Sequence, residues 1–162
     1  MVMEFKGVFM KSKIITIIVS SIILISLAVL LLLPSSNETK KIEGIKEMTF
    51  NRITGMSYDD IISYSIRCND ECNFEYYKGE KIVKKVAVDN NKMKELEDIF
   101  NKYNVSSWNG FEEDDKDVLD GSSFGFSVYM ENGHNIIASG YASFPDNYYD
   151  VVREIENLFQ IN

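Results

Sequence analysis

The segment Ile62–Val88 reads ISYSIRCNDECNFEYYKGEKIVKKVAV, and it decides the fold. Apolar and polar side chains alternate in Ile62–Cys68 and again in Cys72–Tyr76, which is the pattern of strands with one buried face. Ile82–Val88 supplies a third strand. Because the connections between these strands are short and contain Asn, Asp and Gly, the three strands are predicted to pair as an antiparallel meander.

Further elements are expected on both sides of this meander. They are a strand at 48–53, a capped helix at about 89–103, paired strands at 124–130 and 136–142, and a last helix that ends near 159. Asn132 and Gly133 between the paired strands indicate a hairpin, because both residues tolerate positive φ. The sequence therefore predicts an α+β fold with an antiparallel sheet of about five or six strands. The order is β-meander, helix, β-hairpin and helix, with two helices covering the sheet.

A long apolar run, Ile14–Leu33, precedes this domain and contains no charge, proline or glycine. A helix of this length spans about 30 Å, the thickness of a hydrocarbon core. We therefore predict an N-terminal transmembrane helix that acts as a signal anchor. A cleavable signal peptide is the alternative, but its apolar region is typically shorter and is followed by an Ala-x-Ala pattern, which is missing after Leu33.

The charges give this anchor a direction. Residues 1–13 carry three lysines against one glutamate, whereas residues 34–162 carry 14 Lys and Arg against 24 Asp and Glu. A basic flank stays in the cytoplasm. The chain is thus divided into a cytoplasmic basic leader (1–13), the transmembrane helix (14–33), a linker (34–46) and an extracytoplasmic α+β domain (47–162). Because the outer domain is acidic, it would repel phosphates, and no nucleic-acid partner is expected.

Two patterns resemble catalytic or metal sites but lack the required context. Gly121–Gly125 matches the G-x-S-x-G pattern of serine hydrolases, which needs a turn from a strand into a helix and a nearby histidine base. Here the pattern runs into a strand, and the single histidine, His134, lies at the hairpin turn. The acidic run Glu112–Asp120 fails the spacing of an EF-hand. It is interpreted as a solvated loop, with a weak, irregular calcium site as the alternative.

The two cysteines, Cys68 and Cys72, lie in phase with apolar neighbours on either side of a short turn. An extracytoplasmic compartment permits a disulfide between them, and two buried thiols are the alternative. With His134 they would supply three ligands, whereas a structural zinc site needs four. No catalytic residue, metal site or cofactor is therefore predicted, and the possible disulfide is the one site assigned.

Four segments carry a resemblance to a known group of proteins. They are Trp108–Phe111, Val118–Phe124, Ile137–Tyr141 and Phe144–Tyr148. In these segments the chain resembles a family of uncharacterised membrane-anchored or lipoprotein-like domains of Gram-positive bacteria. The resemblance implies no known activity and no catalytic residue. Many members look like lipoproteins, but no cysteine that could accept a lipid follows the apolar run here, so the helix must serve as the attachment.

These observations lead to an expectation about function. We expect a single-pass protein of the bacterial cell membrane, with its N-terminus in the cytoplasm. Its extracytoplasmic domain would bind an envelope protein or peptide rather than act as an enzyme. An extracytoplasmic hydrolase that uses carboxylates is the alternative, and a domain that merely packs beside a partner is a third. A flat sheet face or exposed edge strand would favour binding. A deep cleft with two facing, unpaired carboxylates would favour the enzyme.

Overall fold

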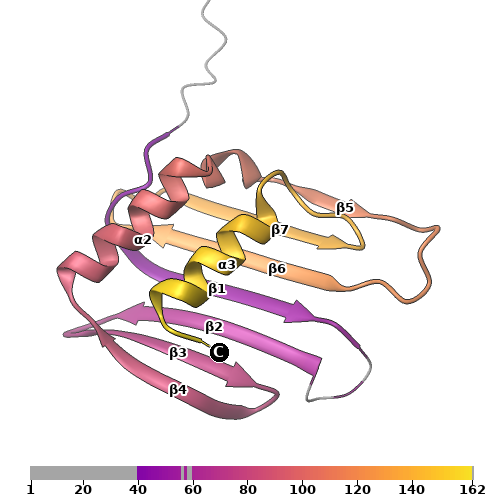
Figure 1. Cartoon of the computed structure of the whole chain (residues 1–162). Coiled ribbons are helices and arrows are strands. Elements are labelled where there is room, and N and C mark those ends of the chain that lie inside the picture. The colour runs from indigo at the N-terminus through magenta and orange to yellow at the C-terminus, as the bar shows by residue number, and fades with distance from the viewer. Residues whose placement is uncertain (1–39, 56, 58–59, 162) are drawn as a thin grey trace, which may run out of the picture. The chain divides into compact units, whose positions relative to one another are not determined.

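The computed structural model describes residues 40–55, 57 and 60–161 (Figure 1). The predicted leader (1–13), the predicted transmembrane helix (14–33) and residues 34–39 of the predicted linker lie outside the described residues. Within the described residues, no helix is both long and apolar enough to cross a membrane.

The described chain forms one seven-stranded sheet with helices on one face. The strands are β1 (Ile45–Ile53), β2 (Ile61–Cys68), β3 (Cys72–Lys78), β4 (Lys81–Val88), β5 (Glu112–Asp114), β6 (Ser123–Met130) and β7 (Asn135–Tyr141). Their order across the sheet is β4-β3-β2-β1-β6-β7-β5. The helices are α2 (Asn90–Lys102), the 3-10 helix η2 (Val105–Trp108) and α3 (Tyr148–Leu158).

The predicted fold class is therefore wrong. The sheet is mixed rather than antiparallel and has seven strands instead of five or six, because β5 pairs parallel to β7. From the sequence, residues 112–114 are interpreted as part of a solvated acidic loop, because their side chains are all charged. The backbone of this segment nevertheless pairs with β7. Gly110 N–H donates to the Ile137 carbonyl at 2.9 Å before the strand, and Asp115 N–H donates to the Tyr141 carbonyl at 2.9 Å after it.

The centre of the sheet is held by β1, which pairs with β2 on one side and β6 on the other. Phe50 on β1 has Tyr64 and Phe126 as its register partners, and its ring centroid lies 5.5 Å and 6.2 Å from theirs. All three side chains are buried. This aromatic row joins the two hairpin halves of the chain into a single core.

Helices α2 and α3 lie on the same face of the sheet (Figure 1). The Asp89 side chain caps α2 by accepting from Lys92 N–H at 2.8 Å, and α2 buries Leu96 and Phe100. At the end of α3, Phe159 stacks on Phe74 with ring centroids 3.8 Å apart. The opposite face of the sheet has no covering layer among the described residues.

Candidate functional site

The uncovered face of the sheet carries small polar side chains at its centre, because every second residue of each strand points away from the helices. The strand register sets two adjacent cross-strand rows there. We call these six residues the central platform: Ser65, Thr49 and Ser127 in one row, and Ser63, Asn51 and Gly125 in the next. Ser65 is itself buried. The uncharged polar contacts of the platform therefore come from the hydroxyl and amide groups of Thr49, Asn51, Ser63 and Ser127, which both donate and accept hydrogen bonds.

Gly125 opens a space at the middle of β6. A Cβ atom built on this residue would meet nothing within 4 Å. The pairing of β6 shows no register shift at Gly125, so the glycine is not needed for a bulge. Glycine weakens a strand, and within a sheet it often marks a place where a ligand or another backbone comes close.

Charged and aromatic side chains border the central platform. On the β4 side, Lys85 Nζ lies 2.7 Å from Glu75 Oε1, and the Tyr77 hydroxyl donates to the same carboxylate. The hydrogen bonds from Lys85 and then Tyr77 hold the pKa of Glu75 below its ordinary value, and the bond to Glu75 raises the pKa of Tyr77. The Glu75 carboxylate is therefore ionised at neutral pH and is held in place by its hydrogen bonds with Lys85 and Tyr77.

A second row borders the platform along the strands. Arg67 Nε lies 3.5 Å from Glu47 Oε1 across β1 and β2, and Glu47 has Tyr129 as its register partner on β6. The Tyr129 side chain is exposed, as is that of Ile137 on β7. An uncharged polar centre with exposed aromatic and aliphatic residues at its border is suited to binding an extended partner.

A second polar cluster lies under α3, on the covered face. The Tyr64 hydroxyl donates to Glu156 Oε1 at 2.6 Å, and an Arg52 guanidinium nitrogen lies 3.9 Å from the same oxygen. Burial, followed by the bond to Glu156, raises the pKa of Tyr64 far above its ordinary value. The buried Tyr148 hydroxyl and Arg52 Nε have no hydrogen-bond partner among the described residues. The Glu156 carboxylate is already engaged by Tyr64, so the cluster ties β1 and β2 to α3.

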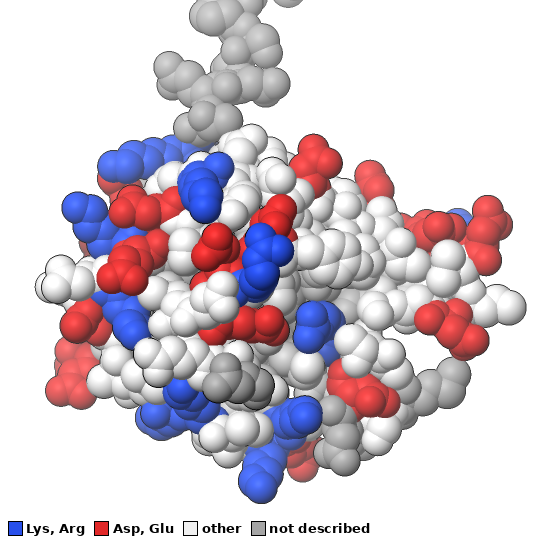
Figure 2. All heavy atoms as spheres, viewed as in Figure 1, with Lys and Arg blue, Asp and Glu red and all other residues white. Residues whose placement is uncertain are grey.

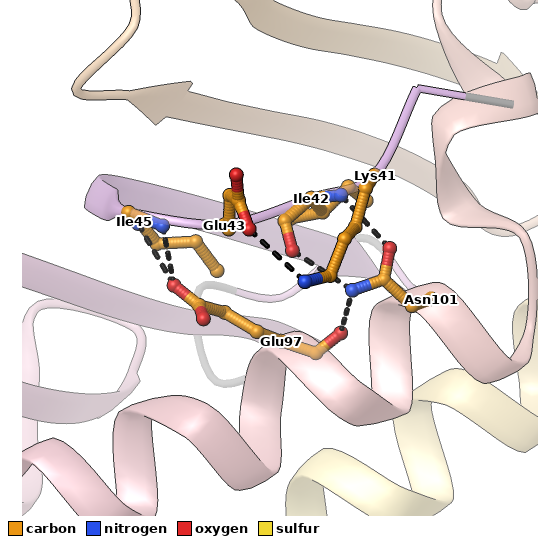
Figure 3. A network of polar contacts seen from close by, with 7 residues as sticks. Lys41, Ile42, Glu43, Ile45, Glu97 and Asn101 are labelled. Carbon is orange, nitrogen blue, oxygen red and sulfur yellow. Dashed lines mark hydrogen bonds and ion pairs between the residues drawn. The ribbon is translucent and has the colours of Figure 1, made fainter.

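Residues 40–45, which we call the stem, enter the domain along α2 (Figure 3). Asn101 Oδ1 accepts from Ile42 N–H at 2.8 Å, and Asn101 Nδ2 donates to the Ile42 carbonyl at 2.8 Å. Glu97 Oε1 accepts from Gly44 N–H at 2.6 Å and Ile45 N–H at 3.2 Å. Ile42 and Ile45 are buried in the core, so the described domain begins within the stretch assigned to the linker (34–46).

A cleft of about 470 Å³ lies between the stem, the β2–β3 turn and α2. Two carboxylates, Glu97 and Glu131, line it together with Cys68 and Cys72. Glu97 is occupied by the two backbone N–H groups of the stem, and the backbone N–H of Glu131 donates to the Gly44 carbonyl at 2.8 Å. The cleft is thus built around the stem, with one of its two carboxylates already used as an acceptor.

The structure separates the residues of the serine-hydrolase pattern from the histidine. Ser123 begins β6 and pairs with Tyr141 at one end of the hairpin, whereas His134 lies in the turn at the other end. The His134 N–H donates to Asn132 Oδ1 at 2.9 Å, as expected in a tight turn. The last three residues of the pattern, Ser123–Gly125, belong to strand β6 rather than to a turn into a helix.

The two cysteines lie opposite each other as the last register pair of β2 and β3. Their Cα atoms are 4.0 Å apart and their Sγ atoms are joined at 2.03 Å. The oxidation state of this pair in the cell stays a prediction. The acidic run supplies β5 and the loop after it, and no cluster of three or more His, Cys, Asp or Glu that could hold a metal occurs in the described part of the chain.

No family model and no curated protein matches this chain. The resemblance to lipoprotein-like domains of Gram-positive bacteria therefore stays a prediction, and the function must be argued from the geometry.

Proposed function

We propose that this chain is a single-pass membrane protein of a bacterial cell envelope whose extracytoplasmic domain binds a protein or peptide partner through the central platform. The observation that carries this proposal is the sheet face opposite α2 and α3, which has no covering layer among the described residues. Its floor is uncharged and polar, and Gly125 leaves open space above it. Such a face suits a partner that brings its own backbone or amide groups close to the sheet.

The attachment of the stem supports the same proposal. Glu97 and Asn101 belong to α2, so they hold residues 42–45 at the helix-covered side of the sheet. The described chain therefore enters the domain beside α2, on the side away from the central platform.

The anchor itself is proposed from the sequence of residues 14–33 and from the charge difference between its two flanks. Its direction is testable with the two cysteines, which are the only ones in the chain. After mild reduction of intact cells, a membrane-impermeant maleimide should label the full-length protein. Labelling only after the cells are broken open would place the domain in the cytoplasm and contradict the proposal.

The binding function is testable by capture from solubilised envelope. Full-length protein in detergent should retain a partner that is lost from the Gly125→Arg variant, because the arginine would fill the space above β6. The matched control is Glu95→Arg, on the exposed surface of α2. Equal capture by all three proteins, or turnover of a glycan or peptide library without any partner, would overturn the proposal.

A carboxylate-dependent hydrolase is the competing function, and its support is the cleft that Glu97 and Glu131 share. Both carboxylates would have to act on a substrate, yet Glu97 accepts two hydrogen bonds from the stem. If the same library were hydrolysed and Glu131→Gln removed the hydrolysis, the enzyme would replace the binding module.

A further inference from the structure

The two edges of the sheet carry opposite charge. The basic edge is β4 with its flanks, where residues 78–92 contain five lysines against two carboxylates in a chain of net charge −8. The acidic edge is β5, whose three residues are Glu112, Glu113 and Asp114, all exposed. In Figure 2, blue side chains gather along the lower border, where Figure 1 places β3 and β4, and red ones gather at the right-hand end beyond β5.

Each edge strand has backbone N–H and C=O groups without a partner in the sheet, so each can pair with another strand. The strand directions decide how two copies would meet. Each neighbouring pair from β4 to β7 is antiparallel, and β5 is parallel to β7. It follows that β5 runs opposite to β4. If the sheet of one copy continues into that of a second with the same faces aligned, β5 of the second pairs antiparallel with β4 of the first.

Exposed apolar side chains lie at the ends that would meet. Ile82 and Val83, at the start of β4, are 48% and 52% exposed, and Leu119, shortly after β5, is 89% exposed. In antiparallel pairing the start of β4 lies beside the end of β5. The loop that presents Leu119 is held in place, because the Tyr141 hydroxyl donates to the Leu119 carbonyl at 2.8 Å and accepts from Gly121 N–H at 2.9 Å.

We infer that copies of this chain associate head to tail, with β5 and the Leu119 loop of one copy docked on β4 of the next. Charge selects this arrangement over the symmetric ones. Pairing of β4 with β4 would bring lysines together, and pairing of β5 with β5 would bring carboxylates together, both of which are unfavourable. A heterologous contact of this kind extends the sheet from copy to copy and forms rows or rings.

This association uses surfaces other than the central platform, so it goes beyond the proposed binding function and can fail separately from it. Confinement to a membrane raises the effective concentration of such copies, so a short edge contact can be sufficient.

The test is cross-linking between two differently tagged full-length chains in the membrane of the expressing cell. One carries Val83→Cys and the other Leu119→Cys, and a bismaleimide is added. We expect the mixed product to exceed both the Val83→Cys pair with itself and the Leu119→Cys pair with itself. Wild-type chains control for any reaction of Cys68 and Cys72, and the fluorescence melting curve of Trp108 reports whether each variant folds.

Charge reversal completes the test. Lys81→Glu in the Val83→Cys chain should lower the mixed product roughly fivefold. Asp114→Lys in the other chain should restore it. Dominant self-pairing of Val83→Cys, a product with a different protein at Val83→Cys, or no product in any combination would overturn the inference. Loss of partner capture by Gly125→Arg with unchanged cross-linking would bear on the proposed function alone.

Discussion

Asn101 on α2 pairs with the backbone of Ile42 as a strand would, accepting from its N–H and donating to its carbonyl, each at 2.8 Å. The same amide also donates to the Glu97 carbonyl one turn earlier at 2.8 Å. Since Ile42 is buried, its backbone groups have little access to water once this pairing is lost. Asn101 therefore fixes the point where the stem becomes part of the domain.

Asn101→Ala should lower the free energy of unfolding by about 2–3 kcal/mol, because two buried backbone groups lose their partner. Urea unfolding of the full-length protein in detergent, followed by the fluorescence of the single tryptophan, Trp108, measures this. Asn91→Ala, at an exposed position in the first turn of the same helix, is the matched control and should change stability by less than about 0.5 kcal/mol. Equal losses in the two variants would contradict the role of Asn101.

Tyr64→Phe should lower stability by roughly 1.5–3 kcal/mol, since it removes a hydrogen bond to the charged Glu156 carboxylate. Because the pKa of Tyr64 is raised in the folded state, its contribution is fully present below the ordinary value of 10.0 and is lost as the pH rises above it. The variant should therefore lose less stability than the wild type on going to alkaline pH. Tyr129→Phe, at an exposed tyrosine, should behave like the wild type throughout.

The Glu75 carboxylate, at the border of the central platform, leads to a prediction about stability at acidic pH. Its folded pKa lies below the ordinary value of 4.5, so the folded state binds fewer protons there and stability is lost as the pH falls below that value. Lys85→Met removes the largest cause of the shift. Melting temperatures measured between about pH 6 and pH 3 should fall less steeply for this variant. A slope equal to that of the wild type would show that the Lys85–Glu75 pair contributes nothing.

The cysteine pair closes a short loop, with a sequence separation of 4. The chain-entropy argument assigns such a loop about 2 kcal/mol. The free energy of unfolding should fall by about that amount when Cys68 and Cys72 are both changed to alanine. Mass spectrometry after alkylation with and without reductant should find both thiols blocked in the native protein. Two freely alkylated thiols would show that the bond does not form in the cell.

Local patterns in the sequence predicted the strands of the meander, the hairpin and both helices, because side-chain alternation and capping residues act over a few neighbours. The position of β1 between β2 and β6 was not predictable in this way. It depends on pairing with residues far away in the chain, such as Phe50 with Phe126. The parallel strand β5 was missed because its acidic side chains resemble those of a solvated loop and its pairing uses only backbone groups.

For the candidate site, the sequence predicts the type of surface but not the residues that form it. An exposed sheet face is expected to favour binding, but the residues of the central platform depend on the register of three strands, which cannot be read from the sequence. The stem contacts were missed for a similar reason. Glu97 and Asn101 are one helical turn apart and look like ordinary surface residues of α2, and only the path of the stem gives them partners.

The central claim, that the uncovered sheet face binds a partner, is tested most directly by site-specific photo-cross-linking in intact cells. A photoreactive amino acid replaces Ser127 in the central platform in one full-length variant and Glu95 on α2 in another. The account predicts a discrete cross-linked partner from position 127 and none from position 95. A partner captured at position 95 alone, or no adduct at position 127 in a protein that melts like the wild type, would contradict it.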